Sequence, residues 1–358
     1  MRVFAYTPFY PPQSQAAAIR CYWLIRSLQD TKHEVRVYSS INTSDSRSLI
    51  FNPTDNKQSF LKRLIFEVLA GCELFLRILF SQFDLYLLSS PPFITIMIAH
   101  MACVIRKKKY IIDVRDIYPD VYFAQGLIRE NSILGRFVKR MTSSMYSGAH
   151  GVLSVTPGLV QKIKRLSPLA RVELLINGYD RELFSPSKEK FTRFTVIFHG
   201  NMGKIQNIPV ILSVAKLIEE EDIDFIFIGE GPQAELFKKD LPKNVKYLGS
   251  KNYSEIPSFI AKAHIGFSAR RDDDIGADAF PVKVFEYIGV GIPVIMTPAN
   301  GVMINMVQSG IYEFQNSQIE EMAKKILEIK NTGEGVILKD NLSRQDISKK
   351  ILEFCDFN

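Results

Sequence analysis

The segment Asp278–Thr297, which reads DAFPVKVFEYIGVGIPVIMT, holds the residues whose types and spacing best suit chemistry on a charged ligand. Pro281 is placed to open a helix that the following glycines end. The helix opening that follows Pro281, from Val282 onward, offers unpaired backbone N–H groups and the positive end of the helix dipole. Lys283 adds a full positive charge to the first turn. We therefore expect this helix opening to hold a diphosphate without a metal ion.

Two carboxylates flank that opening. Asp278 lies just before the helix, and Glu286 lies about one turn beyond Lys283, so the two acids can reach different parts of one bound ligand. The plainer interpretation leaves Glu286 on a solvated helix face and Asp278 in a loop. The acid pair alone does not decide between these two interpretations.

The rest of the chain must position these groups. Short β-branched or aromatic runs alternate with helix-length segments, which predicts parallel sheets with right-handed crossovers. The pattern pauses at the polar stretch 181–190 and then restarts. The expected strands are Arg2–Thr7, Glu34–Ser40, Asp84–Ser89, Tyr110–Val114, Gly151–Val155, Arg171–Ile176, Phe194–His199, Asp224–Gly229, Lys246–Gly249, Ile265–Ala269 and Pro293–Thr297.

Two such series predict two Rossmann-like α/β domains, residues 1–186 and 187–344, followed by a final helix within 345–358. Open parallel sheets bind ligands at the carboxyl ends of their strands. With 358 residues, 46% of them hydrophobic and 23% charged, the chain is long enough for two globular cores. No cleavable signal opens the sequence, and no apolar run reaches the ~18 residues of a membrane span.

The positions of cysteine and histidine and the distribution of charge limit the ligands and partners that we expect for this chain. The four cysteines are scattered and the five histidines lack ligand spacing, which argues against disulfides and a zinc site and favours a reducing cytosol. Residues 1–185 carry a formal charge of +10 and residues 186–358 carry −3. A basic half favours an anionic membrane or a phosphorylated substrate, whereas no nucleic-acid motif accompanies the basic clusters.

These residues resemble glycosyltransferase family 4, the retaining enzymes with the GT-B fold. Asp278 and Glu286 fit its pair of acids, with Asp where Glu is usual. The run from Pro281 to Ile295 is similar to a clade that makes bacterial O-antigen and capsule, often with N-acetylated amino sugars. The resemblance implies that Glu286 binds the ribose hydroxyls of the nucleotide, Asp278 contacts the transferred sugar and Lys283 binds the diphosphate.

Further matches follow in order along most of the chain. The loop Gly200-Asn201-Met202-Gly203-Lys204 resembles the first loop of the family's donor domain, and its N–H groups suit a phosphate. Gly229-Glu230-Gly231-Pro232 resembles its base-proximal turn, so Glu230 joins the expected donor site. A plain strand-to-helix turn is the alternative for the glycine pair. Asn177-Gly178-Tyr179-Asp180 resembles the end of the first domain.

The loop after the first strand departs from the family. Glycines are usual there, but Pro12-Gln13-Ser14-Gln15-Ala16 replaces them, which puts its contact with donor or acceptor in doubt. Gln13, Ser14, Gln15 and Arg20 are the expected acceptor-side residues. The D-x-D within Asp272–Asp274 is interpreted as a solvated loop rather than as a metal site.

The catalytic base is less clear. Relatives often carry a His near the end of the fourth strand, at or near Arg115 here, and arginine cannot accept a proton. Asp113 and Asp116 are therefore the candidates to receive or orient the acceptor's proton. Capping of the next segment and pairing with Arg115 is the open alternative, and the leaving phosphate can assist in place of a base.

Residues 60–80 carry large apolar side chains at helical spacing together with i,i+4 ion pairs. The helix is too charged to span a bilayer but could lie on an anionic membrane surface near the basic clusters. A buried helix of the first domain or a dimer contact is the alternative.

The resemblance thus implies a metal-independent, cofactor-free, retaining transferase. We expect domain 187–344 to bind a UDP-linked amino sugar as substrate. Domain 1–186, with the final helix crossing back onto it, is expected to bind a lipid-linked glycan of bacterial surface polysaccharide synthesis. The protein would lie in the cytoplasm, peripheral to the inner face of the cell membrane. A nucleotide-sugar 2-epimerase of the same fold, or a non-catalytic nucleotide-binding partner, remains the alternative.

Overall fold

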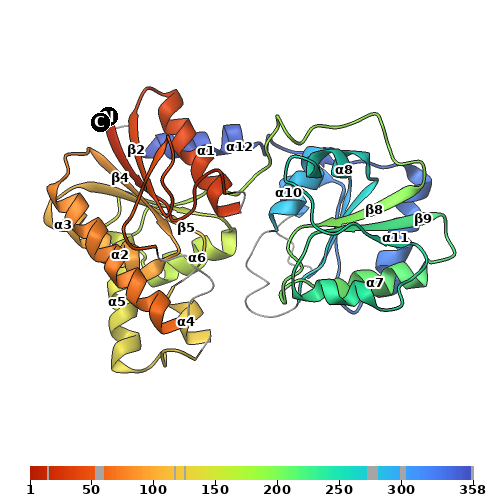
Figure 1. The fold of residues 1–358 in the computed structure, drawn as a ribbon, viewed down its shortest axis with the longest axis horizontal. Coiled ribbons are helices and arrows are strands. Elements are labelled where there is room, and N and C mark those ends of the chain that lie inside the picture. Colours follow the sequence, from red (N-terminus) through yellow and green to blue (C-terminus); the bar gives the residue numbers. More distant parts are fainter. Residues whose placement is uncertain are drawn as a thin grey trace. The chain divides into compact units, whose positions relative to one another are not determined.

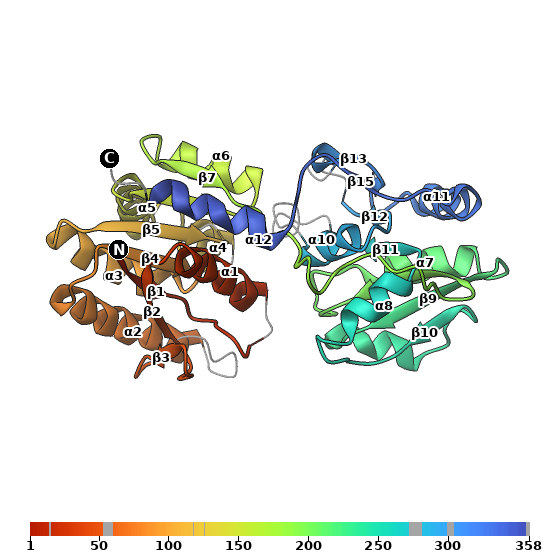
Figure 2. The ribbon, with the colours of Figure 1, turned by 90° about the horizontal axis from the view of Figure 1, so that it is seen from above.

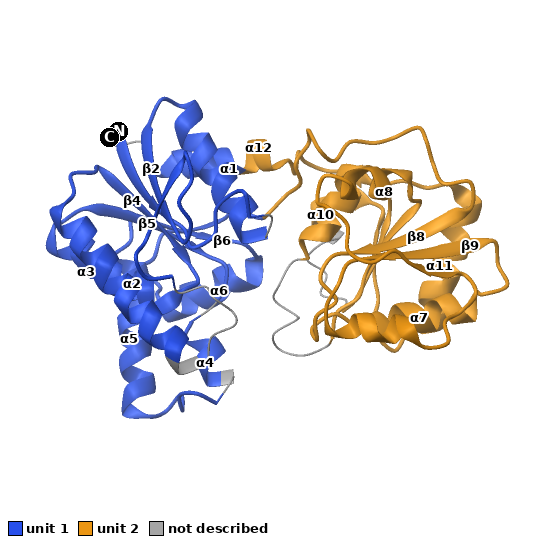
Figure 3. Ribbon diagram, viewed as in Figure 1, with its two compact units in different colours: residues 1–176, 348–358 blue, residues 177–347 orange. Residues whose placement is uncertain are grey.

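The computed structural model describes residues 1–13, 16–52, 60–116, 118–124, 126–271, 281–298 and 304–355. The chain divides into two compact units, shown in blue and orange in Figure 3. The first unit consists of Met1–Ile176 and Ser348–Asn358, and the second of Asn177–Ile347.

The first unit is built on a seven-stranded sheet of order β3-β2-β1-β4-β5-β6-β7, in which every neighbouring pair is parallel. Hydrophobic runs such as LYLL in the central strands fit a sheet that is covered on both faces. Its strands are β1 (Arg2–Tyr6), β2 (Glu34–Ser39), β3 (Ser46–Ser48), β4 (Leu85–Ser90), β5 (Lys109–Val114), β6 (Gly151–Ser154) and β7 (Val172–Leu174).

Helices cover both faces of this sheet (Figure 1). The chain moves from β1 to β2 in one direction and from β4 to β5 in the other, so right-handed crossovers place α1 and α3 on opposite faces. The helices are α1 (Ala16–Asp30), α2 (Phe60–Phe80), α3 (Phe93–Ile105), α4 (Asp120–Ala124), α5 (Ile133–Ser147), α6 (Pro157–Leu166) and the 3-10 helix η3 (Ser348–Phe354).

The second unit repeats this plan with a six-stranded parallel sheet of order β10-β9-β8-β11-β12-β14 and a short antiparallel pair, β13-β15. Its strands are β8 (Phe194–His199), β9 (Ile223–Ile228), β10 (Val245–Tyr247), β11 (Ile265–Ser268), β12 (Val294–Met296), β13 (Val307–Ser309), β14 (Ile311–Glu313) and β15 (Ile337–Leu338). Its helices are α7 (Ile208–Leu217), η1 (Pro232–Lys238), α8 (Ile256–Lys262), α10 (Val282–Gly289), η2 (Ile304–Met306), α11 (Ile319–Thr332) and α12 (Arg344–Ile347).

In each sheet the strand order reverses at one point, between β1 and β4 in the first unit and between β8 and β11 in the second. Loops diverge there, and the crevice at the carboxyl ends of the strands is where open α/β sheets bind ligands. In the second unit, the α10 helix follows β11 and brings its amino end to that edge.

Most of the expected strands are confirmed to within two residues at each end. β3, β13, β14 and β15, each of two or three residues, were not predicted. Two Rossmann-like α/β units with parallel sheets are confirmed.

The units divide after Ile176 rather than at 186, because the next residues bond to the second unit. Tyr179 forms a parallel bridge with Ser343. At the other end of the chain, α12 belongs to the second unit and η3 to the first. η3 packs along α1 (Figure 2). Ser27 of α1 and Ser348 of η3 share a hydrogen bond of 2.7 Å.

The α2 and α3 helices pack closely against each other. A Cβ on Gly71 of α2 would lie 3.0 Å from Ile98 Cβ and 3.2 Å from Thr95 Cα of α3, so the lack of a side chain at Gly71 allows this close approach. The outer side of α2 carries exposed apolar residues: Ile65, Val68, Leu69, Leu76 and Phe80. Across the described ranges, no helix combines the length and the apolar character needed to cross a membrane.

Candidate functional site

The Lys283 ammonium lies at the carboxyl edge of the second sheet. Its Nζ sits 3.6 Å from the centre of the Phe198 ring and donates a hydrogen bond of 3.3 Å to Oε1 of Gln206. A Cβ built on Gly200 would lie 3.7 Å from that Nζ, so the loop after β8 passes directly beside it. α10 supplies this lysine from its first turn, as the sequence predicts.

The charge of Lys283 is poorly compensated. The residue is only 9% exposed, and within the described part of the chain no carboxylate forms an ion pair with it. Burial, followed by the nearby Arg270 charge, lowers its pKa well below the ordinary value, and Glu286 only partly offsets this. A buried cation with an amide and a ring as neighbours is prepared for an anionic ligand.

Glu286, one turn later on α10, has the opposite surroundings. It is 4% exposed, but His199 Nε2 lies 2.8 Å from Oε2, and the Tyr253 hydroxyl donates to Oε1 at 3.1 Å. Arg344 Nη2 lies 3.5 Å from the same Oε1. Burial favours the protonated acid, but these donors and charges outweigh it, so the pKa of Glu286 lies below its ordinary value.

His199 ends β8 and is itself fixed by the next residue of α10. The Tyr287 hydroxyl lies 3.1 Å from His199 Nδ1 and accepts the backbone N–H of His199 at 3.2 Å. Because Nε2 faces the Glu286 carboxylate, Nε2 carries a proton. The imidazole therefore holds Glu286 from one side in a fixed orientation.

The loop Gly200–Lys204 is held by the turn after β9. Met202 N–H donates to the Glu230 carbonyl at 2.8 Å, and a Cβ on Gly229 would lie 1.9 Å from the Gly200 carbonyl oxygen. Gly229 also has φ +141°, a conformation that other residues rarely adopt. A glycine at position 229 is therefore needed for the turn after β9 to contact the loop Gly200–Lys204.

Several donors of this edge bond to no atom of the described residues. They include the backbone N–H groups of Asn201, Gly203 and Lys204, whereas those of Gly200 and Met202 are used inside the protein. Pro281 is the N-cap of α10, so the N–H groups of Val282 and Lys283 also lack a helical acceptor. The side chains of Asn201, Lys204 and Glu230 are exposed.

In the first unit, a buried ion pair lies near the carboxyl end of β5. Arg20 Nη2 lies 2.7 Å from Asp113 Oδ1, and Ser89 donates to Oδ2 at 3.2 Å. The Arg20 guanidinium also donates to the Leu175 carbonyl at 2.7 Å. With exposures of 4% and 0%, Arg20 and Asp113 act in this structure as a tie between α1, β5 and the chain after β7. Asp113 thus pairs with Arg20 rather than with Arg115, the partner in the alternative interpretation.

Asp116 is the accessible member of the two base candidates. Its side chain is exposed, yet the protein around it is dense enough for desolvation to raise its pKa, which Arg115 only partly counteracts. Arg115 bonds instead to the carbonyls of Ser90 and Pro91, at 3.1 and 3.2 Å. Gln13 folds back to accept the N–H of Tyr10 at 3.1 Å.

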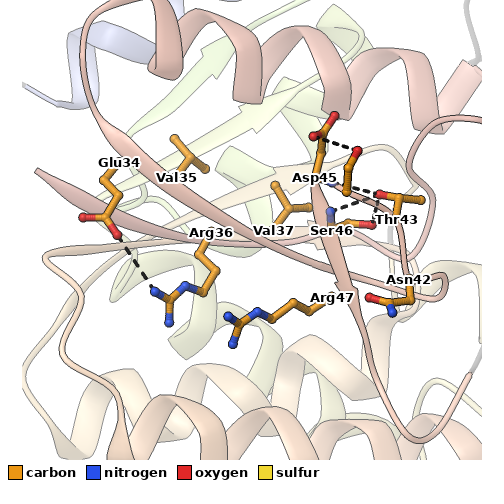
Figure 4. Close-up of a pocket in the computed structure, with 10 residues that line it drawn as sticks. Glu34, Val35, Arg36, Val37, Asn42, Thr43, Asp45, Ser46 and Arg47 are labelled. Carbon is orange, nitrogen blue, oxygen red and sulfur yellow. Dashed lines mark hydrogen bonds and ion pairs between the residues drawn. The ribbon is translucent and has the colours of Figure 1, made fainter.

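Three expected site residues, Asp278, Ser14 and Gln15, lie outside the described residues, as does the Asp272–Asp274 run. In the described ranges, no group of three or more His, Cys, Asp or Glu side chains is arranged to hold a metal ion. A hollow of about 310 Å³ lies at the β2–β3 edge of the first unit, and Figure 4 shows the side chains that line it. Its charged side chains, including Arg36 and Arg47, are exposed, and none of the expected site residues lines it.

Residues 180–349 match the family model described as Glycosyl transferases group 1. This range covers a little less than half of the chain and contains both Lys283 and Glu286. The second unit therefore resembles these transferases in sequence.

Two curated proteins are similar in sequence to this chain. The chain is 22% identical over 214 residues to "Probable glycosyltransferase WbjE" from Pseudomonas aeruginosa, an alignment that covers 56% of this chain and 53% of the relative. It is 30% identical over 142 residues to "Putative teichuronic acid biosynthesis glycosyltransferase TuaH" from Bacillus subtilis, which covers 36% of this chain and 34% of the relative. The matches thus span about half or less of these relatives' lengths.

Among solved structures, sucrose-phosphate synthase from Thermosynechococcus elongatus superposes with a TM-score of 0.68 over 99% of this chain and 94% of the other. The fold is GT-B. At 11% identity this likeness carries the fold alone. It covers both units, so the GT-B assignment extends to the first unit, which the family model does not reach.

The three residues that contact the Glu286 carboxylate were not predicted as site residues. His199 directly precedes the loop glycine, and its position at the end of β8 could have identified it. Tyr253 and Arg344 carry no such signal, because they lie 33 and 58 residues from Glu286 in sequence and meet it only in the fold.

The buried Lys283 predicts an unusual stability effect. Replacing it by Met removes a poorly compensated charge, so Lys283→Met should raise the free energy of unfolding of the unliganded protein by about 1–4 kcal/mol at pH 7. Between the lowered folded pKa and about 10.4, the unfolded chain holds more protons than the folded one, so wild-type stability rises with pH. The stability gain of Lys283→Met over the wild type should therefore decrease as the pH rises.

Urea unfolding of both proteins from pH 7 to pH 10 measures this difference. Lys246→Met is the matched control, because Lys246 is half-exposed and pairs with Asp224. A Lys283→Met variant that is less stable than the wild type, by a margin that does not change with pH, would show that burial of Lys283 does not destabilise the protein.

Proposed function

We propose that this protein is a metal-independent, retaining glycosyltransferase of the group 1 family. The proposed donor is a UDP-linked sugar, with an N-acetylated amino sugar favoured, and the proposed acceptor is a lipid-linked glycan of bacterial surface polysaccharide synthesis. The match over 180–349 and the names of the two relatives support the transferase part. UDP, the amino sugar and retention rest on the family resemblance of the sequence.

The observation that carries the proposal is the state of Lys283. It is buried and points at the glycine loop after β8, and it has no carboxylate partner among the described side chains. A diphosphate placed there would meet the ammonium, the opening of α10 and the unused N–H groups of the loop. These groups supply the positive charge for which other transferases use a metal ion.

On this proposal, the bond between the anomeric carbon of the sugar and the diphosphate oxygen breaks while a bond to the acceptor hydroxyl forms on the same face. The electron pair of the broken bond stays on the diphosphate, where Lys283 stabilises it. Glu286 is held as a carboxylate and accepts from the ribose hydroxyls of the nucleotide. A carboxylate can accept about four hydrogen bonds, and the described donors use three of them.

The proton of the acceptor hydroxyl must be transferred to a base. Asp116 is proposed for it, since it is exposed and its raised pKa brings it nearer to the range of a general base. The departing phosphate is the other candidate on the same face. The proposed contact of Asp278 with the transferred sugar stays a prediction.

The outer side of α2 supports the membrane part of the proposal. Leu76 is 53% exposed and Phe80 80% exposed, in line with Ile65 and Leu69 on the same helix face. Basic residues lie close by, since Arg106 of the α3 terminus donates to the Leu79 carbonyl of α2. An apolar stripe flanked by cations fits the cytoplasmic surface of an anionic membrane.

Transfer from UDP-N-acetylglucosamine to a lipid extract of bacterial membranes, with EDTA present, tests the function. Glu286→Ala and Lys283→Ala should each lower kcat/KM by about 10²- to 10³-fold, because each removes a preorganised charged contact. The matched controls are Glu235→Ala and Lys246→Ala, whose side chains form surface ion pairs, and these should keep the wild-type rate.

Each outcome of this assay separates the alternatives. Unchanged rates in both site variants refute the site assignment. Conversion of the free UDP-sugar without any acceptor identifies an epimerase. UDP binding without turnover on any lipid-linked acceptor identifies a non-catalytic partner.

Membrane binding is tested by sedimentation with vesicles. Wild type should sediment with phosphatidylglycerol vesicles more than with phosphatidylcholine vesicles, and Leu76→Glu should weaken this binding about tenfold or more, because a charge replaces an inserting leucine. Leu217→Glu is the matched control, because Leu217 is also a helical leucine with 53% exposure, but in the second unit. Equal binding of Leu76→Glu and wild type would exclude α2 as the membrane surface.

A further inference from the structure

The second unit begins and ends in two stretches of chain that pair with each other. We call Asn177–Arg181 and Leu342–Ile347 the connecting pair. Tyr179 N–H donates to the Leu342 carbonyl at 3.1 Å, and Arg344 N–H donates back to the Tyr179 carbonyl at 2.7 Å. The backbone of Arg344 is thus fixed by a residue more than 160 positions earlier in the chain.

Side chains reinforce this pairing. Gln345 donates to the Asp180 carboxylate at 2.8 Å, and Arg181 forms an ion pair of 3.0 Å with Asp346. A Cβ on Gly178 would lie 2.5 Å from the Leu342 carbonyl oxygen, and its φ is +61°. Only glycine fits this position, so the close approach of the two segments is built into the sequence.

The connecting pair delivers one side chain to the donor site. Arg344 is 3% exposed, and its Nη2 lies 3.5 Å from Glu286 Oε1, the oxygen that also accepts from Tyr253. His199 holds the other oxygen at 2.8 Å. The orientation of the Glu286 carboxylate therefore depends on both β8, through His199, and the connecting pair, through Arg344.

We propose that Arg344 is a positioning residue of the donor site, which orients Glu286 for the nucleotide and thereby couples nucleotide binding to the pairing of the connecting segments. This inference rests on the proposed function, in which Glu286 contacts the nucleotide. Coupling of this kind is reciprocal: if the connecting pair holds Glu286 ready, bound nucleotide stabilises the connecting pair in return.

A merely structural role makes a different prediction. A buried carboxylate needs compensating charge, so Arg344 could serve only to balance Glu286. In that case the variants lose stability, but the folded molecules bind nucleotide as the wild type does, and nucleotide leaves the connecting pair unchanged. Affinity and local opening, rather than stability, distinguish the two roles.

Calorimetric titration with UDP measures the first consequence. Arg344→Gln should weaken UDP binding about tenfold or more, and Arg344→Lys, which keeps the charge without the planar fork, should weaken it less. Arg193→Gln is the matched control, because Arg193 pairs with Asp222 and Asp224 at the opposite end of β8 and should bind UDP within about twofold of wild type.

Amide hydrogen exchange measures the second consequence. Saturating UDP should slow the exchange of peptides covering 177–181 and 342–347 in the wild type and in Arg193→Gln. In Arg344→Gln at saturating UDP this added protection should be lost. A structural role does not produce this difference, because it involves no link between ligand and local opening.

If Arg344→Gln does not fold, Arg344→Lys and Tyr253→Phe carry the test, since the latter removes one donor to the same Glu286 oxygen. Both should weaken UDP binding, and Arg344→Lys should show reduced protection. Wild-type affinity in the folded Arg344 variants, or no protection of wild type by UDP, overturns the inference alone. A wild type that binds no UDP overturns the donor site of the proposed function, and this inference with it.

Discussion

Two opposite charges buried on one short helix govern the donor side of this protein. Lys283 and Glu286 both lie in α10, three residues apart and almost without exposure. Removing a charge from water costs several kcal/mol unless partners replace the water. Glu286 has those partners inside the protein, from β8, α12 and the loop before α8. Lys283 has only the Gln206 amide and the Phe198 ring among the described residues.

This asymmetry suits a site that binds an anion. The carboxylate is already satisfied and rigid, so it need not reorganise when a ligand arrives. Among the described residues no carboxylate forms an ion pair with the ammonium, so the binding of an anion would offset part of its desolvation cost. The surrounding loops serve this end, because Gly229 allows the turn after β9 to approach the Gly200 carbonyl and to fix the loop beside Lys283.

The sequence predicts the parts of this arrangement that depend on local order. Alternating hydrophobic runs located the central strands, and the proline, lysine and glycines of Pro281–Gly291 located α10 and its two charges. The partners of those charges could not be predicted in the same way. Arg344 reaches Glu286 through the connecting pair, and the Arg20–Asp113 ion pair joins residues 93 positions apart, so both depend on the completed fold. Asp113 illustrates the consequence: a candidate base in the sequence is a buried structural acid in the structure.

The central claim is that the Lys283 ammonium and the amino end of α10 bind the diphosphate of a nucleotide without a divalent ion. The most direct measurement compares the dissociation constants of UDP and uridine in EDTA, for wild type and Lys283→Met. We predict that wild type binds UDP about 100-fold or more tightly than uridine, and that the variant loses most of this preference. An unchanged preference in the variant, or a preference that vanishes in EDTA and returns with manganese, would contradict the account.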